Sequence, residues 1–127
     1  MYTSIQIYIE LVNFIVYRKI TVYKNHFVDF YESKELKVQE KIEYVLDLVR
    51  FERQVPKKFF KSLENTDEIY EIGVITTFKS IRVFCFLDDE SLVVLTNCII
   101  KKTQKTPIKE IRLAEKLKKE YLKDKKG

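Results

Sequence analysis

The sequence predicts an α+β fold, in which a small antiparallel or mixed sheet of about four strands carries two N-terminal helices on one face and a further C-terminal helix. Apolar residues recur at helical spacing in residues 33–53 and 107–124, and they alternate or run continuously in three later segments. Gly and Pro are rare, with 2 of each among 127 residues, so the elements should be joined by short turns. This length is sufficient for one domain with a real core.

The first half of the chain should supply one strand and the two helices. Residues 19–23 alternate polar and β-branched side chains, which is typical of a strand. Residues 25–31 and 33–53 should form helices, because Asn25 and Ser33 are favourable N-cap residues and apolar side chains follow each at helical spacing.

The second half should supply a short helix, a run of strands and the last helix. Pro56 is a good first helical residue and is expected to start a short helix through residue 63. Residues 68–76, 80–87 and 91–100 should then form consecutive antiparallel strands, because the gaps between them are short. The final helix is expected over residues 107–124, with an apolar stripe that includes Tyr121.

The two cysteines should remain unbridged. A turn at residues 88–90 would pair Cys85 with Val94 and Cys98 with Ile81, so the two thiols would not face each other. Unpaired thiols in strands fit a reducing cytoplasm. Two cysteines and a single His at these spacings do not supply a metal site.

Positive charge is concentrated at the C-terminal end. Residues 99–127 hold 11 Lys/Arg and 4 Asp/Glu, a net charge of +7, whereas the preceding 98 residues hold 13 basic and 15 acidic side chains, a net charge of −2. Such asymmetry favours a nucleic-acid or acidic-protein partner. A solvated Lys-rich helix is the alternative explanation.

The first 17 residues are expected to be an extension outside the domain formed by residues 18–127. Residues 4–17 are apolar but are interrupted by Gln6, Glu10 and Asn13, so they are too short and too polar for a transmembrane helix. They also lack the basic start and the small-residue cleavage site of a signal peptide. We therefore expect a cytoplasmic protein that does not enter a membrane.

The connection between the last strand and the last helix is rich in cations and hydrogen-bonding groups. It reads Lys101-Lys102-Thr103-Gln104-Lys105-Thr106-Pro107, with Pro107 expected at the first helical position and Thr106 just before it. Loops that are held by rigid elements often carry function. A cationic loop of this kind suits a polyanion such as nucleic acid.

Several local strings occur in a characteristic order and together cover roughly residues 18–125. They are Val55-Pro56-Lys57-Lys58-Phe59-Phe60-Lys61, Ile69-Tyr70-Glu71-Ile72, Ile81-Arg82-Val83-Phe84-Cys85-Phe86, residues 92–97 followed by 101–107, and Glu110 with Ala114-Glu115. In this order and spacing the chain resembles toxins of the RelE/ParE superfamily from type II toxin–antitoxin systems, in the HigB-like branch.

The resemblance implies a RelE-like fold and a metal-independent endoribonuclease that cleaves messenger RNA on the ribosome and so inhibits translation. It also implies a helix-turn-helix antitoxin as partner and no small-molecule cofactor. In such cleavage the 2′-hydroxyl of the RNA is the nucleophile. The protein must orient this hydroxyl, stabilise a pentavalent phosphorane and move protons.

Arg82, Lys101 and Lys102 are the candidate catalytic residues. Arg82 lies near the start of an inner strand and can make a fixed, bidentate phosphate contact. Lys101 and Lys102 end the adjacent strand and should point to opposite faces if the strand continues, so that at most one faces the scissile phosphate. Replacing Arg82 or Lys102 by Ala is expected to change stability by about 1 kcal/mol or less. The candidate RNA-binding residues are Lys79, Thr103, Gln104, Lys105, Lys109 and Arg112.

Three alternatives remain open at this point. Without the resemblance, Arg82 would be interpreted as a strand-end side chain and the lysines as a solvated loop. The same fold also supports a ParE-like inhibitor of DNA gyrase, which needs no phosphate-cleaving residues. Finally, the family pattern often has Arg after Tyr-Glu-Ile, whereas this chain has Gly73, which is compatible with a degenerate toxin that only binds its antitoxin or nucleic acid. The proton-transfer group is a Lys with lowered pKa, a Tyr or a ribosomal group.

Overall fold

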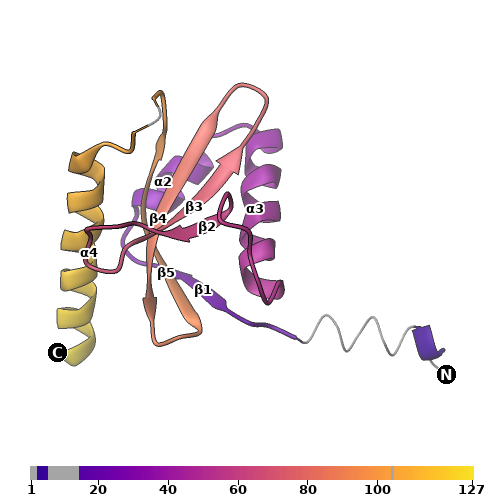
Figure 1. Ribbon diagram of the computed structural model, residues 1–127, viewed down its shortest axis with the longest axis horizontal. Helices are drawn as coiled ribbons and strands as arrows, with labels where there is room; N and C mark the ends of the chain where they lie inside the picture. The colour runs from indigo at the N-terminus through magenta and orange to yellow at the C-terminus, as the bar shows by residue number, and fades with distance from the viewer. Residues whose placement is uncertain (1–2, 6–14, 104) are drawn as a thin grey trace.

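A computed structural model describes residues 3–5, 15–103 and 105–127 of the chain, and in this part the core is a five-stranded mixed sheet (Figure 1). In sheet order the strands are β1 (Lys19–Val22), β5 (Leu92–Ile100), β4 (Ser80–Asp88), β3 (Tyr70–Ile75) and β2 (Phe60–Ser62). β1 runs parallel to β5, and the other neighbours are antiparallel. The α+β prediction is confirmed, with one strand more than expected.

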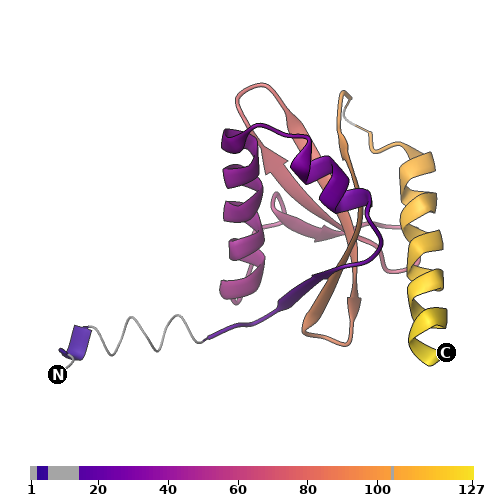
Figure 2. The ribbon, with the colours of Figure 1, turned by 180° about the vertical axis from the view of Figure 1, so that it is seen from behind.

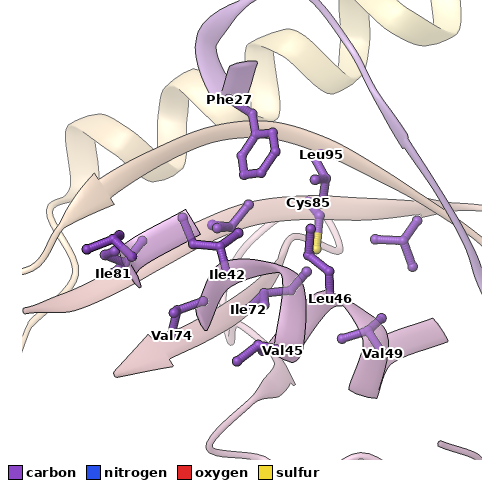
Figure 3. Packing of buried hydrophobic residues seen from close by; sticks show 13 residues of the cluster. Phe27, Ile42, Val45, Leu46, Val49, Ile72, Val74, Ile81, Cys85 and Leu95 are labelled. Carbon is purple, nitrogen blue, oxygen red and sulfur yellow. The ribbon is translucent and has the colours of Figure 1, made fainter. Parts of the chain in front are cut away.

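Helices cover both faces of the sheet, as the two opposite views show (Figures 1 and 2). α2 (His26–Glu32) and α3 (Leu36–Phe51) lie on one face, as predicted, and α4 (Ile108–Lys126) lies on the other. The larger core is formed between α3 and the sheet, where Ile42 and Val45 pack against side chains of β3 and β4 such as Ile72 (Figure 3). One face of α3 closes this core, which explains why the helix has an apolar face and a polar face.

The alternation of side chains along β4 separates the two cores. Val83 and Cys85 point to the α3 side, whereas Phe84 and Phe86 point to the α4 side, where Ala114 joins them. Tyr121 packs edge-on against Phe86 with their ring centroids 5.2 Å apart. The predicted core position of Tyr121 is confirmed, and β4 is buried on both faces.

The prediction of a short helix from Pro56 is wrong. The carbonyl of Pro56 accepts hydrogen bonds from the N–H groups of Phe59 and Phe60 at 2.9 and 3.1 Å, which makes a single turn. The chain then becomes β2, where Phe60 pairs with Ile72 and stacks on Tyr70 with a centroid distance of 5.1 Å. Cross-strand pairing and aromatic packing stabilise this segment more than a second helical turn would.

The predicted register of the β4–β5 hairpin is wrong by one residue near the turn, where Cys85 pairs with Leu95, and by two residues beyond it, where Cys98 pairs with Val83. The additional shift arises because a bulge places two residues of β5 opposite Phe84. The hydroxyl of Thr96, one of those two residues, donates to the Phe84 carbonyl at 3.1 Å. The two cysteines are unbridged, as predicted.

Asn25 is the N-cap of α2, as predicted, but the starts of the two later helices differ from the predicted caps. Ser33 ends α2 and its hydroxyl donates to the Phe30 carbonyl at 2.6 Å, so that Glu35 becomes the N-cap of α3. At the last helix, Pro107 occupies the N-cap position and not the first helical position. Within the described residues, no helix has the length and apolar character needed to cross a membrane.

Candidate nucleic-acid interface

A buried carboxylate holds Arg82 in place on the α4 side of the sheet. Glu71 of β3 is 2% exposed, and its Oε1 lies 3.2 Å from Nε of Arg82, whose side chain is 18% exposed. The Thr106 hydroxyl donates to the same Oε1 at 3.3 Å, and Nζ of Lys61 lies 3.7 Å from Oε2. The pair therefore fixes the guanidinium and ties the polar loop after β5 to the sheet.

This ion pair changes what is expected from the loss of Arg82. A strand-end Arg that reaches into water contributes little to stability, but Arg82 neutralises a carboxylate with almost no access to solvent. Removing Arg82 would leave the charge of Glu71 with Lys61 and Thr106 alone. From this ion pair we expect a cost above the ~1 kcal/mol that the sequence alone suggested.

Gly73 faces Arg82 across the β3–β4 pair, and this position has no room for a side chain. A Cβ at Gly73 would lie 2.4 Å from the carbonyl oxygen of Lys58 and 2.9 Å from Nη1 of Arg82. The N–H of Gly73 also donates to the Phe59 carbonyl at 2.9 Å. Glycine is thus required by the close approach of the segment before β2, and an Arg here would force that backbone to move.

Three lysines that the sequence analysis did not assign lie on one side of Arg82. A cavity of about 90 Å³ is lined by Lys57, Lys58, Lys61, Glu71, Gly73, Ile75 and Arg82. These lysines were missed because residues 56–63 were expected to form a helix. The signal that identifies them is the register of β2 with β3, which sets Lys61 opposite Glu71.

Two predicted catalytic lysines lie on the other side of Arg82. A cavity of about 390 Å³ is lined by Ser80, Arg82, Lys101, Lys102 and Thr103. The condition under which Lys101 and Lys102 would face opposite sides, a strand that continues through them, is not met, because β5 ends at Ile100; both lysines border this cavity. The N–H of Lys101 donates to the Ser80 carbonyl at 2.6 Å, which holds the start of the loop against β4.

The two cavities share Arg82 in their linings, and we call the charged and polar residues around them the cationic site. It comprises Arg82 and Glu71 with Lys57, Lys58 and Lys61 on one side and Lys101, Lys102 and Thr103 on the other. Among these residues Glu71 is the single acid, and its oxygens contact Arg82, Lys61 and Thr106. Such a surface attracts polyanions, with a fixed guanidinium at its centre.

Four of the remaining predicted RNA-binding residues lie outside the cationic site. Lys79 borders a different cavity, together with Val38 of α3. Lys105 is exposed on the loop after β5, and Lys109 is exposed in the first turn of α4. Arg112 is also on α4 and donates to Glu115 at 2.6 Å, so its charge is partly neutralised.

The loop residues Thr103 and Gln104 have different outcomes. Thr103 lines the cationic site, and its hydroxyl donates to the carbonyl of Lys105 at 3.2 Å. Gln104 lies outside the described residues. The structure therefore brings Thr103 together with Arg82, Lys101 and Lys102 and leaves the other polar candidates around the site.

The titratable groups with shifted pKa values do not supply a proton acceptor at Arg82. Burial raises the pKa of Cys85, and the nearby Glu71 carboxylate raises it further, so this thiol stays neutral. The Tyr121 hydroxyl donates to Asp88 at 2.7 Å, which raises the pKa of Tyr121, and Asp88 is at the far end of β4 from Ser80. Among the described residues no group of three or more His, Cys, Asp and Glu could hold a metal ion.

Comparison with known proteins gives one family. The family model described as "Phage derived protein Gp49-like (DUF891)" matches residues 29–119. The match extends from within α2 into α4 and includes every residue of the cationic site. No curated protein matches the chain.

Proposed function

Since the chain belongs to the Gp49-like family of phage-derived proteins, which is associated with RelE-like toxins, we propose that it is the toxin of a type II toxin–antitoxin system in the HigB-like branch. As a toxin it is a ribosome-dependent, metal-independent messenger-RNA endoribonuclease that acts in the cytoplasm and inhibits translation. Its partners are messenger RNA on the ribosome and a helix-turn-helix antitoxin. The observation that carries this proposal is Arg82, which buried Glu71 fixes between two groups of lysines.

In the proposed reaction, the 2′-oxygen of one nucleotide attacks the adjacent phosphorus and the bond from phosphorus to the 5′-oxygen breaks. The products are a 2′,3′-cyclic phosphate and a 5′-hydroxyl end; the 2′-hydroxyl gives its proton to a base, and the departing 5′-oxygen takes one up. Negative charge grows on the non-bridging oxygens in between. A preorganised cation at these oxygens lowers the barrier because it needs no reorganisation as the charge develops.

Arg82 is suited to contact those oxygens. Glu71 engages its Nε, and the Ile81 carbonyl accepts from Nη1 at 3.4 Å, so donors of the terminal amino groups remain for a phosphate. Lys102 and Lys101 add charge from the adjacent cavity. We therefore assign Arg82 to the scissile phosphate and the lysines to the same phosphate or its neighbours.

Gly73 favours a second candidate, a toxin that binds its antitoxin or nucleic acid but does not cleave. In the family pattern, an Arg at this position adds a cation on the same face of the sheet. Here the space is occupied by the Lys58 carbonyl and the Arg82 guanidinium. If the Arg of the pattern is needed for cleavage, its absence removes activity and leaves the anion-binding surface.

The test is single-turnover cleavage on programmed ribosomes, together with mapping of messenger-RNA ends after expression without an antitoxin. We expect growth arrest and new 5′-hydroxyl ends inside translated messages. Arg82→Lys should be strongly impaired because a point charge does not reproduce a guanidinium, and Lys102→Ala should also lose cleavage. Lys123→Ala, an exposed lysine near the end of α4, is the control and should cleave normally.

Each of the other outcomes identifies a different function. Growth arrest with DNA damage and intact messages would indicate a gyrase inhibitor. Soluble, folded protein that neither arrests growth nor cleaves would indicate the binding-only toxin. Cleavage by the Arg82 variant at the wild-type rate would refute the assignment of the site.

A further inference from the structure

Basic side chains form a line along the outer face of α4, over its first three turns. Lys109, Arg112, Lys116 and Lys119 recur at spacings of three and four residues, which places them on one face of the helix, and all four are exposed. Each lies two residues from an apolar side chain that packs inward, as Lys116 does from Ala114, and two residues correspond to about 200° around a helix. The four residues, which we call the basic stripe, therefore point away from the sheet.

The basic stripe presents positive charge that the rest of the protein does not neutralise. Within the part of the chain that the structure describes, Lys109, Lys116 and Lys119 form no salt bridge. Arg112 is paired with Glu115 at 2.6 Å, and Glu115 also accepts from the N–H of Asp67 at 2.9 Å. The stripe thus carries the charge of three lysines over the ~15 Å of helix between Lys109 and Lys119.

The stability of the helix does not explain this arrangement. Cations in the last turn, such as Lys123, interact favourably with the helix dipole, but Lys109 is in the first turn, where the dipole disfavours a cation. A solvated helix face usually mixes both signs, as α3 does with exposed Lys37, Glu40 and Asp47. The single sign of the basic stripe instead indicates a polyanionic ligand.

Buried hydrogen bonds fix the basic stripe relative to Arg82. The side chain of Asn97 in β5, which is 2% exposed, donates to the backbone carbonyl and to the carboxylate of Glu110, both at 3.1 Å. Just before the helix, the Thr106 hydroxyl donates to Glu71, which holds Arg82. The first turn of α4 is therefore attached to the sheet beside the cationic site, and one large ligand can contact the stripe and the site together.

The chemistry of this face suits a nucleic-acid backbone and not a protein partner. The cores of protein interfaces are depleted in Lys and contain apolar or aromatic side chains. The exposed large apolar side chains of α4, Ile108 and Leu122, lie outside the stretch from Lys109 to Lys119. Figures 1 and 2 show α4 at the edge of the molecule, so its outer face is open to a ligand of any size.

We propose that the basic stripe binds the phosphate backbone of ribosomal RNA, in a contact separate from the message at the cationic site. The inference rests on the proposed function, which supplies the ribosome as the polyanion. Contacts to phosphates fix the position and orientation of a protein on nucleic acid and carry no sequence information. Because the stripe and Arg82 belong to one rigid unit, binding at the stripe orients Arg82 toward the message for any codon.

The experiment measures binding of the whole chain to vacant small ribosomal subunits, without message, over a series of salt concentrations. The variant is Lys109→Gln/Lys116→Gln/Lys119→Gln. We expect it to bind at least about tenfold more weakly than the wild type at low salt. The slope of log affinity against log salt concentration should decrease in magnitude by about 2–3, because each lost phosphate contact removes about 0.7–0.9 from it.

A matched control removes the same charge elsewhere. Lys19→Gln/Lys24→Gln/Lys37→Gln replaces three exposed lysines outside α4. This variant should keep the wild-type salt slope and bind within about twofold of the wild type, because these lysines do not belong to the stripe. Circular dichroism and urea unfolding should show that both variants fold, since exposed Lys and Gln have similar helix propensities.

The outcomes separate the basic stripe from the proposed cleavage. The inference is overturned if both triple variants weaken equally, because net charge alone would then determine the affinity. It is also overturned if the stripe variant binds the subunits as the wild type does, including the case in which it loses only its affinity for the antitoxin. A wild type that cleaves in that case keeps the proposed function. A wild type that binds vacant subunits through the stripe but does not cleave supports the stripe and refutes the cleavage.

Discussion

Loss of Arg82 should destabilise the fold as well as remove cleavage. In Arg82→Ala the Glu71 carboxylate, which is 2% exposed, would keep Lys61 at 3.7 Å and the Thr106 hydroxyl at 3.3 Å as partners. Breaking a fully buried pair costs about 3–5 kcal/mol. Because the Arg82 side chain is 18% exposed and Lys61 remains, we expect a smaller loss of about 2–3 kcal/mol in the free energy of unfolding.

A double-mutant cycle with Glu71→Gln measures the pair directly. Glu71→Gln alone leaves Arg82 charged at a partly exposed position and should cost about 1–2 kcal/mol. The variant with both changes has no unpaired buried carboxylate. Its decrease in the free energy of unfolding should therefore be smaller, by about 1–2 kcal/mol, than the sum of the decreases in the two single variants. The measurement is urea unfolding at neutral pH with Arg112→Ala as control, because the Arg112 side chain is 65% exposed in its pair with Glu115 and should contribute roughly 0.5 kcal/mol.

The same variants separate the two roles of Arg82. Cleavage should be compared at a temperature where every variant is folded, so that lost activity reflects the site and not the folded fraction. We expect Arg82→Ala to raise the barrier by about 2–4 kcal/mol, and Glu71→Gln to have a smaller effect because the guanidinium is kept but no longer fixed. Wild-type stability in Arg82→Ala, or additive losses in the cycle, would refute the argument that Glu71 holds Arg82.

Three further predictions concern the fold. Gly73→Ala should lower the free energy of unfolding by about 1–3 kcal/mol, because its Cβ would lie 2.4 Å from the Lys58 carbonyl oxygen; unchanged urea unfolding would show that this segment yields easily. Hydrogen bonds from Lys125 and Tyr121 lower the pKa of Asp88, so its contribution is present above the ordinary pKa and is lost as the pH falls through the lowered value; Asp88→Asn should flatten the decline of stability below about pH 4 in acid unfolding. Removing residues 1–17 should change the free energy of unfolding by about 1 kcal/mol or less, and a larger loss would show that these residues belong to the domain.

The periodicity of apolar residues correctly predicted the helices and strands in which the pattern repeats over many residues. α3 and β4 repeat their apolar positions over several turns or alternations, so both their type and their buried faces followed from the sequence. β2 has three residues and no period of its own. It is a strand because β3 pairs with it, and this information is tertiary and cannot be seen in residues 56–63 alone.

The hairpin register was wrong in two steps: the loop between the paired residues Asp88 and Leu92 is one residue longer than expected, and a bulge then shifts the pairing by one more residue. A bulge adds one residue to β5 opposite Phe84, and the hydroxyl of Thr96 stabilises it by bonding the Phe84 carbonyl. Thr is common in strands, so nothing in the local pattern marks this position. The error did not affect the conclusion about the cysteines, because they are offset in both registers.

The sequence predicted the part of the candidate site whose basic residues can be recognised within one segment or one strand, namely the lysines after β5 and Arg82. It did not predict the part that forms only when strands pair. Glu71 reads as an ordinary polar residue in a strand, and its burial depends on Arg82, Lys61 and Thr106, which come from three other parts of the chain. Buried polar groups of this kind are recognised by their partners and not by their neighbours in sequence.

Gly73 shows why a departure from a family pattern has to be judged in three dimensions. In the sequence, Gly73 stands where the family pattern often has an Arg, so it suggests that a cation is missing. In the structure Nη1 of Arg82 would lie 2.9 Å from a Cβ at this position, and the Lys58 backbone covers the rest, so the glycine lets the guanidinium reach toward buried Glu71. The adjoining cavity still has Lys57, Lys58 and Lys61 on its wall. The positive charge on this side of Arg82 therefore comes from β2 and the segment before it and does not require a cation at position 73. If the proposed function holds, we expect these lysines to contribute to phosphate binding in a salt-dependent way.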